Sequence, residues 1–520
     1  MGTENSPTPP SGLHNRKAGL SMNALNTLEV PCDPQDPNFS RWFDSSIGPH
    51  QSSVTRPMRT GNQVTSFIGG AATYAAMGAA MATATGPGHY IYMLNWWVDL
   101  TVTLGSSTLS DIITKACAAG VQVRALFWDQ PGTQNNAEAY FICSSSAQKT
   151  PGDGYAIVDN NTLYVGSHHQ KILVVNGSSG LIAFCGGVDF NPDRISYLPL
   201  EPGSPLHDVH CRIVGPAAWD LLQIFVDRWN DHPTSANVSA LRATSNDPLP
   251  AANGDQYVQI GRTFPNGSKF AGISSRNGKS YYSFAQYGEQ TCEAIIFKAI
   301  AQAQQFIYVQ DQYLQSMDAS NALKAALPNI KKLIILIPHP SLSDHPNIWR
   351  FEKAFLDNLG YDPTFKYDPN NPNDPKAKIA VCYLKGAGLA PNPKLVPPAT
   401  QGTYVHSKMW IIDDKFAVIG SANCNNRGYT NDSEVVAGIY DQSKNTPCTL
   451  HFAHDLRNQL WSLHLGLSLN DVFDPIGAAA HWLAPTVASG VGRFNQNADT
   501  DSSWAPRNQI ADNTSEPIGN

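Results

Sequence analysis

The chain carries one succession of helices and apolar strands twice, and this internal repeat restricts its fold more than any other feature. In the first half, a helix of small residues over 71–85 precedes the apolar run HYIYMLNWW. In the second half, a helix over 291–304 precedes FIYVQDQYL. A further helix and apolar strand follow in each half, the strands being VQVRALFWD and KKLIILIPH. Helices that alternate with continuous apolar strands are typical of α/β units around a buried, mostly parallel sheet.

We therefore predict an α/β protein with two homologous halves, each a mixed, mostly parallel β-sheet flanked by helices. The length of 520 residues agrees with this, because single cores seldom grow so large. The stretch 232–260, rich in Asn, Pro, Ala and Ser, is the expected boundary. The predicted parts are an N-terminal tail at 1–60, a first half at 61–245, a second half at 246–475 and a C-terminal tail at 476–520.

Each half also has a histidine and a lysine where a strand begins. His169 and Lys171 precede ILVV, and His406 and Lys408 precede MWII. Residues i and i+2 of a strand share a face, so each histidine points the same way as its lysine. A single HxK motif is as readily a solvated strand end. Two copies at corresponding places of a repeat predict that both halves contribute to one pocket.

A pocket with two histidines and two lysines is suited to cleaving a phosphodiester. Two ammonium groups neutralise the phosphate and the charge that develops in its transition state. One neutral imidazole can attack phosphorus and form a phosphohistidine, while the other histidine acts as general acid and then as general base. A catalytic histidine needs an acceptor on its second nitrogen, and Asp208 and Glu434 are the candidates. The chemistry alone leaves open which histidine attacks.

Neither a metal site nor a broadly basic binding surface is expected. The spacings of known metal motifs are absent, and DPNNPNDP at 368–375 lacks the pattern of a calcium loop, so we interpret it as a surface loop. Nine cysteines without a CxxC pair indicate reduced, mostly buried thiols. The formal charge of -7 and a pI near 6.1 weigh against a nucleic-acid partner.

The N-terminal segment has no apolar core of a signal peptide. Gly2 and Ser6 fit a myristoylation pattern, although a disordered tail explains the composition as well. The stretch 67–86 is long enough to span a bilayer but consists mainly of Ala, Gly and Thr, so we predict a packed helix and no transmembrane segment. The expected localisation is cytoplasmic or peripheral at a membrane, with any export independent of a signal peptide.

The motifs resemble those of the phospholipase D superfamily. YVHSKMWIIDDKFAVIGSANCNNRGYTNDSE closely resembles the second catalytic motif of eukaryotic-type phospholipases D. IYVQDQYL is similar to an IYIENQYF-like strand of that group, and HDVHCRIVGPAAWDLLQIFVDRWND resembles the segment that closes its first half. The resemblance extends over residues 65–470.

This resemblance implies one active site at the interface of the halves and a phosphohistidine mechanism on phospholipids. The products are phosphatidic acid and the head-group alcohol, or a new phosphatidyl ester when a primary alcohol replaces water (transphosphatidylation). No cofactor or metal is required. Carried over by motif, His169 is the nucleophile, His406 the general acid/base, Asp208 the residue that orients His169, and Glu434 the residue that orients His406, while Lys171, Lys408, Asn423 and Asp189 bind the phosphate.

Some features depart from the family pattern or stay open. Asn176 replaces the final Asp of the first motif, and we expect it to be structural because it lies far from the HxK end. His168 should face away from Lys171 and play a supporting or core role. The sequons at Asn176 and Asn431 fall inside the motifs and are interpreted as chance. GAGLAPNPKLVPP at 386–398 is either an apolar lip for membranes or a Pro-rich connector.

The preferred function is a monomeric phospholipase D that meets its substrate at a membrane surface or micelle, with water or a primary alcohol as acceptor. A phosphatidyltransferase that resembles cardiolipin synthase and a nuclease or other phosphodiesterase would use the same chemistry. A non-catalytic phosphate-binding scaffold belongs to a different class, and the intact His and Lys residues of both copies disfavour it.

Overall fold

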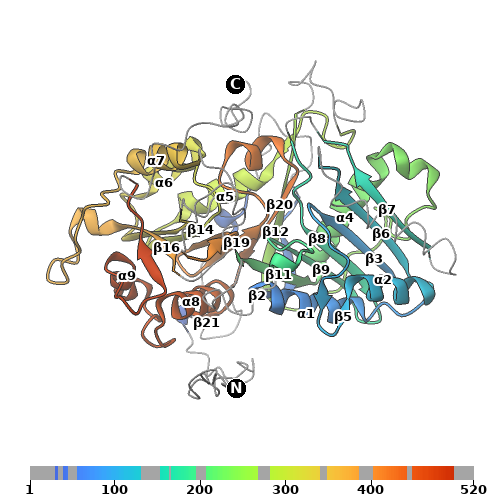
Figure 1. Ribbon diagram of the computed structural model, residues 1–520, viewed down its shortest axis with the longest axis horizontal. Coiled ribbons are helices and arrows are strands. Elements are labelled where there is room, and N and C mark those ends of the chain that lie inside the picture. The colour runs from blue at the N-terminus through green and yellow to red at the C-terminus, as the bar shows by residue number, and fades with distance from the viewer. Residues whose placement is uncertain are drawn as a thin grey trace, which may run out of the picture.

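Both halves of the chain contribute to one continuous β-sheet (Figure 1). The computed structural model describes residues 30–32, 39–44, 56–130, 153–162, 166–194, 206–266, 282–339, 348–385, 402–441 and 448–496. The sheet has 16 strands. In order across it lie β22 (Val491–Arg493), β16 (Ile379–Leu384), β15 (Lys332–Leu336), β14 (Phe306–Gln310), β18 (Lys408–Ile412), β19 (Phe416–Gly420), β20 (Glu434–Tyr440), β12 (Gln256–Phe264), β2 (Arg59–Ile68), β11 (Val209–Val214), β9 (Gly180–Gly186), β8 (Ile172–Gly177), β3 (Tyr90–Asn95), β6 (Gln122–Trp128) and β7 (Asp153–Asp159), and β13 (Glu289–Gln290) pairs with β12.

The strand order repeats outward from the junction of the halves. The first half runs β2, β11, β9, β8, β3, β6 and β7, and the second runs β12, β20, β19, β18, β14, β15 and β16. The pairing directions match at every step. β2 and β12 join the halves through an antiparallel contact in which Gln256 lies opposite Asn62. The predicted α/β fold of two homologous halves is confirmed by this topology.

Parallel pairing is less extensive than expected. Among the described strands of this sheet, only β3, β6 and β7 in one half and β14, β15 and β16 in the other are parallel, and the strands nearer the junction are antiparallel. The reason lies in the connections. Only Ser178 and Ser179 separate β8 from β9, and residues 413–415 separate β18 from β19. A parallel crossover needs a dozen residues or more, so these pairs must be hairpins.

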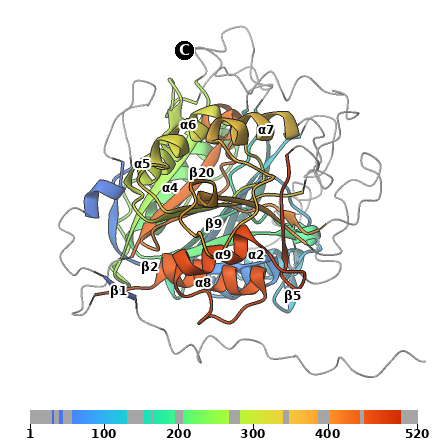
Figure 2. The same ribbon diagram turned by 90° about the vertical axis from the view of Figure 1, so that its left-hand side faces the viewer.

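Helices cover both faces of the sheet. Figure 2 shows α5, α6 and α7 on one side of it and α8 and α9 on the other. α1 packs into the first-half core through Tyr74, Met77 and Met81, as expected for the Ala-rich stretch. No helix in the described ranges is long and apolar enough to cross a membrane. The helices are α1 (Gly70–Met81), α2 (Leu109–Ala118), α4 (Pro216–Asp231), α5 (Thr291–Gln302), α6 (Met317–Ala326), α7 (Ile348–Leu359), α8 (Phe452–Leu465) and α9 (Pro475–Leu483).

Local signals set several helix ends. Thr108 accepts a hydrogen bond from the backbone of Asp111 where α2 begins, and Ser316 caps α6 in the same way. Asp474 caps α9, and its neighbour Pro475 occupies the first turn, where a missing N–H costs nothing. α8 ends at Gly466, which adopts a left-handed φ of 69°. The short elements are β1 (Val30–Cys32), β4 (Thr103–Leu104), β5 (Ser107–Thr108), β10 (Leu206–His207), β17 (Tyr404–Val405), β21 (Cys448–Leu450), η1 (Phe39–Trp42), η2 (Pro192–Arg194), η3 (Pro233–Asn237), η5 (Pro375–Lys378) and η6 (Arg427–Asn431).

Both predicted tails include parts of the folded structure, which corrects their boundaries. α9 and β22 fall within the stretch 476–520, and β22 pairs with β16 so that Arg493 lies opposite Cys382. At the other end, β1 pairs with β21, and η1 buries Trp42, whose ring stacks on Phe416 at 5.6 Å between centroids. Buried apolar residues, among them Trp42, Trp482 and Phe494, pack these segments on the second half.

Other expectations divide between the described and undescribed parts of the chain. Residues 368–375 form turns with mostly exposed side chains, as expected for a surface loop. Gly2 and the candidate lip at 386–398 lie outside the described residues. Free, buried thiols are confirmed for the six cysteines that the structure describes in detail, which are Cys117, Cys185, Cys211, Cys292, Cys382 and Cys424.

A buried arginine close to the first motif forms an ion pair within the first half and hydrogen bonds to the second half. Arg228 of α4 donates through Nε to Asp159 at 2.7 Å. Its Nη1 donates to Ser433 of the second half at 2.6 Å, and its Nη2 donates to Tyr282 at 3.2 Å. Arg228 and Asp159 are both essentially inaccessible to solvent. Removing one member of such a pair leaves an uncompensated buried charge.

We expect R228M to destabilise the protein by about 3–5 kcal/mol because Asp159 would lose its main counter-charge. Urea unfolding followed by circular dichroism measures the change. K353M provides a matched control, since Lys353 pairs with Asp357 at 2.6 Å on the exposed surface of α7, and such pairs contribute under about 1 kcal/mol. Equal effects of R228M and K353M would contradict a structural role for the buried pair.

Candidate active site

The two predicted histidines are each held by the backbone of the opposite half. The N–H of His169, just before β8, donates to the carbonyl of Ser433 at 3.0 Å. The N–H of His406, just after β17, donates to the carbonyl of His207 at 2.8 Å. β10 and β17 also pair in parallel and so join the halves beside His406. The structure therefore brings both motifs to the junction of the halves, as the sequence repeat predicts.

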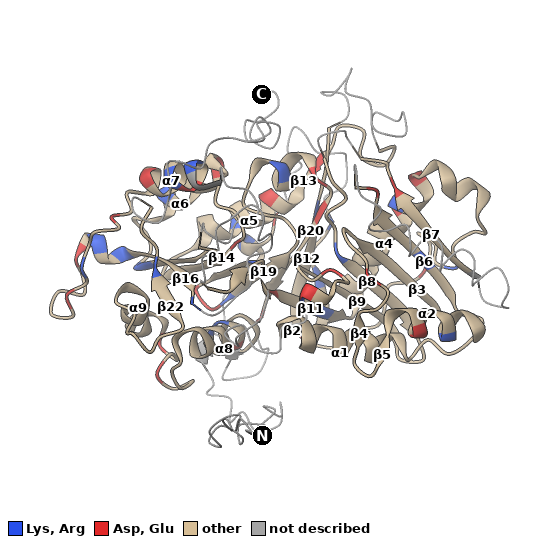
Figure 3. Cartoon of the chain, viewed as in Figure 1, with Lys and Arg blue, Asp and Glu red and all other residues tan. Residues whose placement is uncertain are grey.

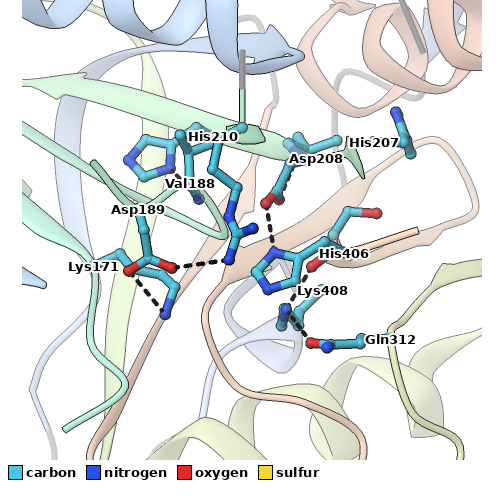
Figure 4. A network of polar contacts seen from close by, with 12 residues as sticks. Lys171, Val188, Asp189, His207, Asp208, His210, Gln312, His406 and Lys408 are labelled. Atoms are coloured by element: carbon cyan, nitrogen blue, oxygen red, sulfur yellow. Dashed lines mark hydrogen bonds and ion pairs between the residues drawn. The ribbon is translucent and has the colours of Figure 1, made fainter. Parts of the chain in front are cut away.

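Each histidine is oriented by a carboxylate from the other half. Nδ1 of His169 lies 2.8 Å from Oε1 of Glu434, and Nδ1 of His406 lies 2.7 Å from Oδ2 of Asp208 (Figure 4). The predicted pairing of Asp208 with His169 and of Glu434 with His406 was therefore wrong. The reason is local: Glu434 follows Ser433 and Asp208 follows His207, the residues whose carbonyls hold the opposite histidine.

Two small residues, Ser421 and Gly187, lie next to these carboxylates. Ser421, in the turn after β19, donates its hydroxyl to the second oxygen of Glu434. Gly187, in the corresponding turn of the first half, lies against Asp208. A Cβ added at Gly187 would lie only 2.1 Å from Oδ1 of Asp208. The glycine of the GGVD turn is therefore required by the close approach of the carboxylate.

The surroundings of both imidazoles favour their neutral forms. Burial, with the charges of Lys171 and Lys408, holds the pKa of His169 well below its ordinary value. Burial, with Lys408 and other cations, does the same to the pKa of His406. Burial also raises the pKa of Asp208 to about 6 and that of Glu434 well above its usual range. With Nδ1 engaged by a carboxylate, Nε2 is the nitrogen left for chemistry.

The two lysines are buried beside the histidines of their own motifs. Nζ of Lys171 donates to the carbonyl of His169 at 2.9 Å. Nζ of Lys408 donates to the carbonyl of His406 and, at 2.8 Å, to Oε1 of Gln312. Burial lowers the pKa of Lys408 to about 8. Two buried ammonium groups within electrostatic reach of each other provide a strong site for a phosphate.

The predicted phosphate ligands Asn423 and Asp189 differ in their surroundings. Asn423 is buried, and its side-chain oxygen has no hydrogen-bond partner among the described residues. Oδ1 of Asp189 accepts from the backbone of Trp96 at 3.2 Å and lies 3.4 Å from Nζ of Lys171. Oδ2 of Asp189 lies 3.4 Å from Arg194. A carboxylate in these contacts would repel a phosphate, so the assignment of Asp189 as a phosphate ligand does not fit its contacts.

Two residues flagged in the first motif lie away from the site. Asn176 is at the far end of β8 from Lys171, opposite Tyr90 of β3, as expected for a structural position. His168 is fully buried, with Nδ1 3.0 Å from Asp159. Its supporting role in the core is therefore confirmed by its contacts. In the second half, the corresponding Asp413 accepts backbone hydrogen bonds from residues 304–306 at the start of β14.

Comparisons with known proteins place the chain in a family. The sequence profile described as "Phospholipase D" matches residues 196–335, and that described as "Cardiolipin synthase, PLD-like domain" matches residues 296–456. Phospholipase D alpha 2 of Oryza sativa subsp. japonica is 24% identical over 543 residues, covering 79% of this chain and 65% of the relative. Phospholipase D alpha 1 of Vigna unguiculata is 23% identical, with the same coverage. The chain belongs to the phospholipase D superfamily. It is of the eukaryotic type and spans 65% of the length of these relatives.

Among solved structures, phosphatidylserine synthase of Haemophilus influenzae Rd KW20 is similar to this member of the superfamily. The TM-score is 0.48 at 13% identity, over 74% of this chain and 83% of the other. Polyphosphate kinase of Porphyromonas gingivalis is also similar, with a TM-score of 0.41 at 12% identity, over 72% of this chain and 47% of the other.

The candidate site includes residues that the sequence did not point to. Gln312 holds Lys408 and lies in the strand-end motif IYVQDQYL, which the sequence singled out without a role for it. Trp96 lies against the site, its ring 6.0 Å from Nζ of Lys171 and 6.4 Å from the ring of His169. Arg194 contacts Asp189 but lies at the end of the short η2, which has no recognisable motif. Within the described residues, no cluster of three or more His, Cys, Asp or Glu side chains is arranged to hold a metal ion.

Proposed function

We propose that the protein is a phospholipase D that hydrolyses the distal phosphodiester of glycerophospholipids to phosphatidic acid and a head-group alcohol. One observation supports it above all. Two histidines from opposite halves each have Nδ1 bound by a carboxylate, and each has a buried lysine two residues away. This arrangement supplies a nucleophile, an acid/base and two phosphate-binding cations in one pocket.

In the first step, Nε2 of His169 attacks phosphorus, and the bond from phosphorus to the head-group oxygen breaks as the phosphorus–nitrogen bond forms. Nε2 of His406 donates a proton to the departing oxygen. Burial and nearby cations favour the neutral form of His406, but a phosphate anion between the lysines offsets these positive charges and favours its protonated form. Lys171 and Lys408 neutralise the negative charge on the non-bridging phosphate oxygens, and the amide of Asn423 donates a further hydrogen bond to them.

In the second step, His406 accepts a proton from a water molecule, whose oxygen attacks phosphorus and displaces His169. Phosphatidic acid leaves, and both histidines return to their starting states. A primary alcohol can take the place of water and give a phosphatidyl alcohol (transphosphatidylation). No metal or organic cofactor takes part in this proposal. All the groups come from one chain, so a monomer acting at a membrane surface or micelle is sufficient.

A phosphatidyltransferase is the second candidate, because part of the chain matches the profile described as "Cardiolipin synthase, PLD-like domain". It would use the same phosphohistidine but an alcohol in place of water. A nuclease is disfavoured by the formal charge of -7 and by the mixture of acidic and basic residues on α2 and α7 (Figure 3).

Head-group release from vesicles tests the proposal. Vesicles of phosphatidylcholine, phosphatidylethanolamine or phosphatidylglycerol are incubated with the protein, with and without ethanol, and single-stranded DNA serves as the alternative substrate. We expect free head group with phosphatidic acid, and phosphatidylethanol when ethanol is present. Turnover of phosphatidylglycerol mainly to cardiolipin would favour the transferase. Cleavage of DNA without head-group release would contradict both lipid activities.

The pH dependence of kcat/KM is expected to be bell-shaped. Asp208 and Glu434 must be ionised to orient their histidines, and burial raises the pKa of both, that of Asp208 to about 6, so activity falls as the pH drops through the range in which they become protonated. Lys408 must be protonated to bind phosphate, and its pKa is lowered to about 8, so activity falls above this value. K408R keeps its charge and should extend the alkaline limb. An unchanged alkaline limb in K408R would rule out Lys408 as its origin.

A further inference from the structure

The two halves differ at one matching position, in the turn that follows β19 in the second half and β9 in the first. After β19, the turn GSAN presents the amide of Asn423, which can donate hydrogen bonds to an anion. After β9, the matching turn GGVD presents the carboxylate of Asp189, which cannot. Asp189 is fully buried and accepts from the backbone of Trp96 and Trp97, at 3.2 and 3.3 Å. The first half therefore lacks the neutral donor that the second half has.

A buried guanidinium lies next to this carboxylate. Arg194 has a side-chain exposure of 8%, and its Nη2 lies 3.4 Å from Oδ2 of Asp189. Its Nη1 donates to Asp193 at 2.8 Å. A guanidinium has five N–H donors, and the buried Nε of Arg194 has no hydrogen-bond partner within the described residues. Such an unpaired donor on a buried cation is costly unless a ligand accepts from it.

The charge of Arg194 acts on the opposite side of the pocket as well. It lowers the pKa of His406 and of Lys408, after the larger effects of burial and of nearer charges. It also opposes the rise in the pKa of Asp208 that burial causes. Figure 4 shows Lys171 and Asp189 together, with Asp208, His406 and Lys408 beside them. Arg194 therefore contacts Asp189 and lies within electrostatic reach of the Asp208–His406 pair.

We propose that Arg194 binds a non-bridging oxygen of the scissile phosphate and fills, in the first half, the place that Asn423 has in the second. Asp189 acts as a positioning residue, because it holds both Arg194 and Lys171 by ion pairs. Three cations and one amide then surround a phosphate whose charge grows in the transition state. This inference rests on the proposed function for its substrate, but its anion site can be tested without a lipid.

Binding of inorganic phosphate and of vanadate to the full chain, measured by isothermal titration calorimetry, tests the anion site directly. We expect R194Q to weaken both by roughly 10- to 100-fold, the effect of losing a hydrogen bond between charged groups. R194K retains the charge and should weaken binding less. R212Q is the matched control, since Arg212 of β11 donates to Thr65 and has no contact with the site. It should bind as the wild type does.

The double variant D189N/R194Q provides the sharper test. The asparagine introduced at 189 reproduces the second-half turn, so we expect phosphate binding to recover to within roughly 10-fold of the wild type. The double variant also removes the carboxylate that R194Q alone would leave unpaired, so it remains informative if R194Q does not fold. A folded R194Q that binds phosphate as tightly as the wild type would overturn the inference, as would a double variant that binds more than roughly 100-fold more weakly than the wild type.

Lipid activity separates this inference from the proposed function. If the wild type binds phosphate and R194Q does not, the anion site is supported even when no head group is released from vesicles. Wild-type protein that binds neither phosphate nor vanadate would overturn the inference, and head-group release then decides the proposed function alone.

Discussion

H169A is expected to lose phospholipid hydrolysis by ~10⁴-fold or more, because no other group would be placed to attack phosphorus. H406A should lose a similar amount on natural lipids, since a poor leaving group needs its proton. The two variants should differ on a phosphatidyl ester of p-nitrophenol, whose leaving group needs no proton. H406A should then release about one equivalent of p-nitrophenol per protein in a rapid burst and stall at the phosphohistidine. H169A should release none.

Stopped-flow absorbance at the p-nitrophenolate band measures the burst, and H168A provides a neighbouring histidine as control. His168 lies against Asp159 and not in the pocket, so H168A should retain a burst even if its stability is lower. A burst in H169A and none in H406A would show that the nucleophile is His406, which would reverse the assigned roles while leaving the two-histidine site intact.

E434Q and D208N are expected to reduce activity by roughly 10³- to 10⁴-fold, because an amide cannot hold the histidine in the required tautomer as a carboxylate does. Because each carboxylate binds the histidine of the opposite half, the two variants should affect different steps of the reaction. Glu434 binds His169, so E434Q should slow the burst with the p-nitrophenyl ester. Asp208 binds His406, so D208N should keep a fast burst and slow the steady state that follows.

The same stopped-flow measurement separates crossed from uncrossed pairs. A slow burst in D208N and a fast one in E434Q would contradict the crossed geometry. D357N is a useful control, because Asp357 pairs with Lys353 at 2.6 Å on the exposed surface of α7. It should leave the burst close to that of the wild type.

The sequence was sufficient for the parts of the site that depend on local spacing. The HxK pairs, both carboxylates and Asn423 could be named because each lies in a motif that repeats or that resembles a family motif. The α/β character of the halves followed from alternating helices and apolar strands. The placement of Asn176 far from the HxK end followed from its position five residues after Lys171 along an extended strand.

The crossed pairing could not be predicted, because it depends on contacts between segments more than 190 residues apart. Ser433 and His207 bind the backbone of the opposite histidine, and only this exchange shows which carboxylate reaches which imidazole. Arg194 was missed for a similar reason, since its role depends on Asp189 pointing toward it. The antiparallel strands near the junction are as apolar as the parallel strands, so their composition does not reveal their direction. Only the short connections between them distinguish the two kinds of pairing.

The most direct test of the two-histidine site is to trap its covalent intermediate. H406A and the wild type are mixed with a phospholipid radiolabelled at phosphorus and quenched within milliseconds, and the labelled peptide is identified by mass spectrometry. We expect label on His169, more of it in H406A than in the wild type, and none in H169A. Product formation by the wild type without any labelled histidine in either protein would contradict the phosphohistidine site.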